Sequence, residues 1–153
     1  MSAADRGKGL ESEFRNECKK YERMSRFAFH RYPDLRAGSR VPAPADFQTC
    51  YNGQLRLVEL KETLTEGRLP YANFDKDQVA RMRLWDMAGG ESWVIVLHKK
   101  SGLYRALRVD YFRERKEKQG SWFFEMESEA PLPEHEELTT KSISDVFRYI
   151  HKM

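Results

Sequence analysis

The sequence predicts an α/β protein in which helices flank a mixed central β-sheet. Three observations indicate this class. Segments with helical spacing of apolar residues alternate with strand-like segments. The run Trp93 to Leu97 is apolar throughout, which is typical of a strand covered on both faces. Asn52-Gly53 separates two strand-like segments, as in a β-hairpin. We expect one domain, because 153 residues can bury a sizeable core.

The first half of the chain is expected to hold one helix and three strands. An apolar stripe that starts at Leu10 predicts a helix to about Arg23, and the alternating segment 27–32 predicts a strand. Residues 33–45 contain three prolines, a glycine and two arginines, so they are expected to form a loop. Segments 45–51 and 54–61 are predicted to pair around a type I′ turn, which needs positive φ at both central residues.

The second half continues the alternation. The expected elements are, in order, a helix over 74–88, strands over 92–98 and 103–109, a short helix or loop over 110–119, an edge strand over 121–125 and a last helix up to His151. Asn73 or Asp75 can cap the middle helix, Gly89-Gly90 ends it, and Ser144 can cap the last one.

Charge is distributed unevenly along the chain. Residues 125–153 hold three basic and seven acidic side chains, so with +3 overall the first 124 residues carry +7. We expect residues 1–124 to form the main domain, and 125–153 to form an acidic linker and a C-terminal helix that packs on it. A basic body indicates a polyanionic partner.

Several classes of protein are excluded. No apolar run is long enough to span a membrane, and the first residues lack the apolar segment of a secretory signal. Two cysteines cannot form a disulfide framework, which indicates a cytoplasmic, reducing location without deciding between a bacterial and a viral origin. The four histidines lack ligand spacing and are expected to be structural or exposed, and Trp85, Trp93 and Trp122 are expected in the core.

The predicted hairpin brings charged side chains together. A two-residue turn at 52 and 53 places Asp46 opposite Glu59, and alternation places Lys61 on the same face. Opposed like charges are destabilising, so the pair needs compensation. One interpretation is a surface ion cluster in which Lys61 offsets both acids. The other is a divalent metal site, which the apolar flanks on both faces favour. Carboxylate oxygens suit Mg²⁺, for which Mn²⁺ can substitute.

The surrounding motifs are similar to those of a known family. Asp46 followed by Glu59-x-Lys61 resembles the signature of the PD-(D/E)XK nucleases. With it come Arg6-Gly7-x-x-Leu10-Glu11, Glu59-Leu60-Lys61-Glu62-Thr63, Leu69-Pro70-x-x-Asn73-Phe74-x-x-x-Gln78 and Tyr111-Phe112-x-x-Arg115-Lys116-Glu117-Lys118. In this order they resemble the RecU-type Holliday-junction resolvases over about residues 6–120. The resemblance implies a restriction-endonuclease-like fold.

The resemblance also implies roles for individual residues. Asp46 and Glu59 would hold the metal, with Glu11 as a third acid near it. Lys61 would orient the attacking water and stabilise charge on the phosphate, and Gln78 would support the site. Arg6 would lie near the DNA backbone. The implied activity is a Mg²⁺-dependent endonuclease of DNA recombination and repair, a homodimer that resolves four-way junctions by paired symmetric nicks.

One difference from the family, a shorter segment before the Asp-bearing strand, means that functions other than junction resolution remain alternatives. Family members usually carry a long basic stalk before the Asp-bearing strand, whereas only residues 33–45 fill that gap here. A general or flap-directed nuclease is therefore an alternative, as is a non-catalytic DNA-binding module, although the intact acids argue against the latter. For any single basic residue, a solvated surface charge is the more common case. The candidate phosphate contacts are Arg6, Lys8, Lys19, Arg36, Arg40 and Lys76.

Overall fold

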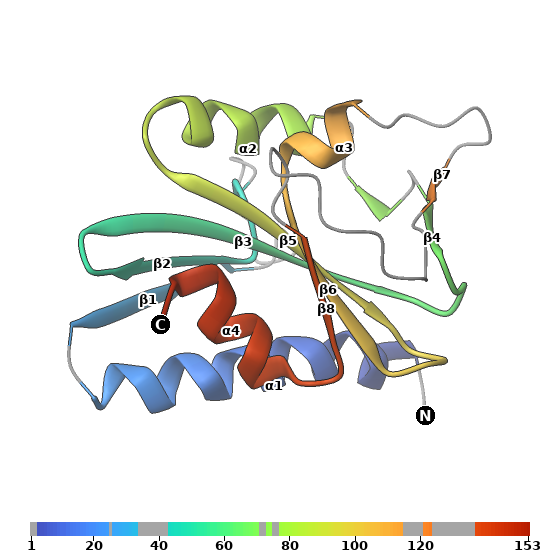
Figure 1. Cartoon of the computed structure of the whole chain (residues 1–153), viewed down its shortest axis with the longest axis horizontal. Helices are drawn as coiled ribbons and strands as arrows, with labels where there is room; N and C mark the ends of the chain where they lie inside the picture. Colours follow the sequence, from blue (N-terminus) through green and yellow to red (C-terminus); the bar gives the residue numbers. More distant parts are fainter. Residues whose placement is uncertain are drawn as a thin grey trace.

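The computed structural model describes residues 3–24, 26–33, 43–70, 73–74, 77–114, 121–123 and 137–153. These residues form a mixed sheet with helices on both faces, which confirms the predicted α/β class (Figure 1). The elements are α1 (Ala3–Glu22), β1 (Phe27–Arg31), β2 (Phe47–Tyr51), β3 (Gln54–Thr63), β4 (Arg68–Pro70), α2 (Gln78–Met87), β5 (Glu91–His98), β6 (Leu103–Arg108), α3 (Asp110–Glu114), β7 (Ser121–Phe123), β8 (Glu137–Thr140) and α4 (Ile143–His151).

The main sheet has six strands in the order β1-β2-β3-β5-β6-β8. The β3–β5 pair is parallel, and the other neighbours are antiparallel. All eight residues of β5 are buried, which confirms the prediction of a central strand from its apolar run. In Figure 1, α2 crosses one face of the sheet on the way from β3 to β5.

The β2–β3 hairpin has the predicted register. Phe47 pairs with Val58 and Tyr51 pairs with Gln54, so opposed residues sum to the same value along the whole ladder. Both turn residues have positive φ, 52° at Asn52 and 78° at Gly53. This conformation is why the turn needs an Asn-Gly pair.

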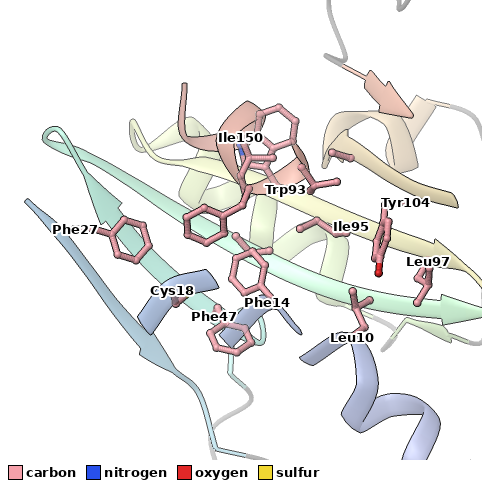
Figure 2. Close-up of a cluster of buried hydrophobic side chains, with 14 residues drawn as sticks. Leu10, Phe14, Cys18, Phe27, Phe47, Trp93, Ile95, Leu97, Tyr104 and Ile150 are labelled. Atoms are coloured by element: carbon pink, nitrogen blue, oxygen red, sulfur yellow. The ribbon is translucent and has the colours of Figure 1, made fainter. Parts of the chain in front are cut away.

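Two cores lie on opposite faces of the sheet. On one face, α1 and α4 cover a cluster that includes Phe14, Phe47, Trp93 and Ile150 (Figure 2). On the other face, α2 and α3 cover a second cluster; its members include Leu57, Met82, Val94, Val96, Leu107 and Phe112. Because side chains alternate along a strand, the central strands β3, β5 and β6 contribute to both layers.

Two helix starts differ from the predictions. The middle helix starts at Gln78, after Asp77, so Asn73 is not its cap, and Asp75 lies outside the described residues. The last helix is capped by Ser142, whose side chain accepts a hydrogen bond from the Asp145 N–H. The predicted cap Ser144 lies inside this helix, which already begins at Ile143, and its hydroxyl donates to Glu17 Oε1 on α1 at 2.8 Å.

Other differences concern the sheet edges and the surface. Segment 121–123 does not extend the main sheet but pairs with β4, and β8 forms an edge that the sequence did not predict. Trp85 is 38% exposed on α2 instead of lying in the core, whereas Trp93 is fully buried as expected. Among the described helices, none is long and apolar enough to cross a bilayer.

Candidate active site

Glu59 and Lys61 point from β3 toward the layer formed by α2 and α3. Their partners across β5 are Val94 and Val96, and both valines belong to the core beneath α2. Glu59 is 3% exposed. A carboxylate in such an apolar setting is stable only with compensating charge or hydrogen bonds. The face shared by Glu59 and Lys61 is therefore the chemically unusual part of β3.

Asp46 lies directly before β2, at the same end of the hairpin ladder as Glu59. The ladder ends at the pair Phe47 and Val58, and continuing the register by one step places Asp46 beside Glu59. The Asp46 carboxylate accepts a hydrogen bond from the backbone N–H of Leu60 at 2.9 Å. The backbone of β3 therefore holds the Asp46 carboxylate next to the residue that follows Glu59.

The Lys61 ammonium contacts residues at the start of α2 and in the segment that leads into it. Its Nζ donates to the backbone carbonyl of Asn73, and to Gln78 Oε1 at 3.5 Å. The ring centroid of Phe74 lies 4.6 Å from the same Nζ. The structure thus brings Lys61 and Gln78 together. It adds Asn73 and Phe74, which the sequence places in a motif but for which we expected no contact with Lys61.

Glu11 is placed differently from these residues. It projects from α1 and forms an ion pair with Arg31, at the end of β1. Among the described residues, no group of three or more His, Cys, Asp or Glu side chains could hold a metal ion. The structure therefore does not gather Glu11 with Asp46 and Glu59 into a three-acid set.

The donor set of Asp46 and Glu59 fits a hard divalent cation. Mg²⁺ is commonly held by one or two carboxylates and completes its shell with water and phosphate oxygens. Asp46, Glu59 and Lys61 bring two anions and one cation to the same end of the hairpin. Chemically, two carboxylates beside an ammonium can hold a hard cation.

Glu62 points to the opposite face of the sheet, as alternation predicts. Its β5 partner Leu97 belongs to the core beneath α1, and its Oε1 lies 3.8 Å from Lys99 Nζ. Burial raises the pKa of the Glu62 carboxyl, an effect that the Lys99 charge opposes. This acid is separated from the Glu59 face by the sheet itself.

The candidate DNA contacts are only partly described. Lys19 is exposed in the last turn of α1. Arg6 and Lys8 belong to α1, where the structure describes the backbone. Arg36, Arg40 and Lys76 lie outside the described residues.

Comparisons with known proteins give a fold-level likeness. No family model matches the chain, and no curated protein sequence matches it. Among solved structures, the chain is similar to Hjc of Archaeoglobus fulgidus, described as a Holliday junction resolvase from an archaeal hyperthermophile. The identity is 14%, the TM-score is 0.49, and the similarity covers 75% of this chain and 88% of that chain. A likeness of this size carries no inference about activity.

Proposed function

We propose that the chain is a metal-dependent DNA endonuclease that cleaves four-way junctions. One observation carries the proposal: the hairpin holds Asp46 beside the buried Glu59, with Lys61 on the same face. The motifs around these residues resemble RecU-type resolvases, which supports junction DNA as the substrate. The net charge of +7 over residues 1–124 is consistent with a polyanionic substrate.

Each side chain has a task in phosphodiester hydrolysis. Asp46 and Glu59 would hold Mg²⁺, which when bound lowers the pKa of a water molecule and polarises the phosphate. Lys61 would present a fixed positive charge to the phosphoryl oxygens and orient the attacking water. Gln78 accepts from the Lys61 ammonium and so restricts where that charge can lie.

The finer proposal concerns substrate geometry and assembly. A four-way junction is two-fold symmetric, so paired nicks require two copies of the site, most simply in a homodimer. The alternative is a general or flap-directed nuclease. Segment 33–45, short for the family stalk, favours this alternative. Digestion of synthetic four-way, flap and linear DNA, with and without Mg²⁺, separates the two.

Single substitutions of the acids test the chemistry. We expect Asp46→Asn and Glu59→Gln to reduce junction cleavage by about 100-fold or more, because each removes a charged oxygen donor. Binding to junction DNA in Ca²⁺ should remain, and Mn²⁺ binding measured by calorimetry should weaken in both variants. The control is Glu22→Gln, an exposed site on α1 with the same change of charge. Near-normal cleavage by either acid variant would refute the assignment.

A further inference from the structure

We propose that Phe74 is a positioning residue whose ring face holds the Lys61 ammonium, and that Phe112 fixes the ring in place. The catalytic meaning of this inference rests on the proposed function. The contact itself does not depend on that function, because it is defined by the positions of the two side chains.

The contact has the geometry of a cation–π interaction. The Lys61 Nζ lies 4.6 Å from the Phe74 ring centroid, within the range of about 6 Å in which the ring quadrupole attracts a cation. Phe74 is 9% exposed. The interaction therefore forms largely away from water, where attraction of this kind is strongest.

Aromatic packing determines how the Phe74 ring is oriented. Its centroid lies 5.2 Å from that of Phe112, with 48° between the ring planes. Phe112 is fully buried and contacts Tyr111 in an edge-on arrangement at 5.4 Å. Both residues belong to the short helix α3, which directly follows β6. The position of Lys61 on β3 is thus linked, through two rings, to a helix about 50 residues later in the chain.

Asn73 anchors the same turn to β3. Its backbone carbonyl accepts from the Lys61 ammonium, and its side-chain Nδ2 donates to the Glu62 carbonyl at 3.5 Å. Residues 73 and 74 therefore contact two successive residues of β3. These two hydrogen bonds attach the segment that carries the ring and the carbonyl to β3 beside Lys61.

A lysine side chain needs such support. It is a point charge on a flexible four-carbon stem, with none of the planar hydrogen-bonding geometry that orients an arginine. Stabilisation of developing negative charge is most effective when the cation is already in place and does not have to reorganise. Phe74 supplies this restraint without donating or accepting a proton.

Two substitutions separate the ring face from simple packing. Phe74→Tyr keeps an aromatic face but adds a hydroxyl to a crowded site, whereas Phe74→Leu keeps an apolar side chain and removes the ring. We expect Phe74→Leu to slow single-turnover junction cleavage by about 10- to 100-fold. Phe74→Tyr should stay within about 3-fold of wild type. DNA affinity in Ca²⁺ should change little in either variant, because the loss is in the rate of cleavage.

A spectroscopic measurement tests the contact without any activity. Protons on the Lys61 Cε beneath a ring face are shifted upfield by the ring current, and their NMR signal is assigned by its loss in Lys61→Ala. The shift should persist in Phe74→Tyr and disappear in Phe74→Leu. Phe29→Leu, which removes a partly buried ring from the opposite core, is the matched control and should alter neither the shift nor the rate.

The outcomes distinguish this inference from the proposed function. Cleavage that does not depend on Lys61 would overturn the proposed function, and with it the catalytic role of Phe74. Lys61-dependent cleavage that Phe74→Leu leaves unchanged would overturn the inference alone. The inference also fails if the Lys61 signal is not shifted, or if the rates of both Phe74 variants simply follow their thermal stability.

Discussion

The stability of the fold should depend on pH through His151. This side chain lies at the end of α4 and is 1% exposed. Its Nδ1 lies 2.8 Å from the Phe147 carbonyl, to which it donates, so Nε2 accepts from the Thr49 hydroxyl, also at 2.8 Å. Burial, reinforced by the nearby charge of Arg56, lowers the pKa of His151 from 6.5 to about 3, although the bond to Phe147 opposes the change.

The sign of the effect follows from where protons bind. Between pH 6.5 and about 3 the unfolded chain protonates this histidine while the folded chain keeps it neutral. Acidification therefore favours unfolding. The contribution is fully present above pH 6.5 and falls by about 1.4 kcal/mol for each pH unit below it. At pH 4.5 we expect a loss of about 3 kcal/mol in the free energy of unfolding from this group.

Urea unfolding of wild type and His151→Gln at pH 7.5 and 4.5 measures this contribution. Carboxylates also titrate in this range, but they affect both proteins, so the difference between the two pH dependences isolates the histidine. The variant should lose about 3 kcal/mol less than wild type on acidification. His30→Gln, at an exposed position, should behave like wild type. Parallel pH dependences for wild type and His151→Gln would refute the reasoning.

Other contacts lead to further predictions. Ser142→Ala should lower the free energy of unfolding by about 1 kcal/mol through loss of the α4 cap, measured by urea unfolding. Asp86→Asn weakens bonds of 2.7 Å to both the Ser92 N–H and the Arg108 guanidinium, and should cost about 2–3 kcal/mol in the same assay. Phe14→Ala should cost about 3–5 kcal/mol, seen as a lower thermal midpoint, because the side chain is fully buried between two other rings.

Local signals accounted for the central part of the fold. The Asn52-Gly53 turn predicted the hairpin and its register, because a two-residue turn with positive φ at both positions strongly prefers this pair. The apolar run of β5 predicted its burial on both faces. In each case the signal lies within a few residues of the feature it predicts, so no knowledge of distant contacts was needed.

Elements that depend on distant partners were missed or misplaced. β4 is three residues long and exists as a strand because it pairs with β7, some fifty residues later. β8 has no apolar alternation and is defined by its pairing with β6. Trp85 was expected inside because tryptophan is usually buried, yet position 85 lies on the outer side of α2. Strand pairing between distant segments, and the side of a helix that faces solvent, depend on contacts that form only in the folded chain.

In the candidate site, too, local sequence signals predicted some features, and contacts between distant segments determine the others. Asp46, Glu59 and Lys61 could be grouped from the sequence because one hairpin carries all three. The hydrogen bond that holds the Lys61 ammonium could not be predicted. Its acceptor is the backbone carbonyl of Asn73, and every residue has a backbone carbonyl, so the residue type gives no signal. The pairing of Glu11 with Arg31 joins α1 to β1, and the spacing of neither segment indicates it.

The packing of β3 explains why the candidate site is held in register. Val58 belongs to the core beneath α1, whereas Glu59 points to the other face. A slip of one residue in the pairing would exchange these faces, so that Val58 would lie beneath α2, and Glu59 and Lys61 would lie in the apolar core beneath α1. The hydrophobic burial that selects the hairpin register thus also selects the position of the charges. A variant with one residue inserted at Gly53 should therefore lose the core of α1 and the candidate site together.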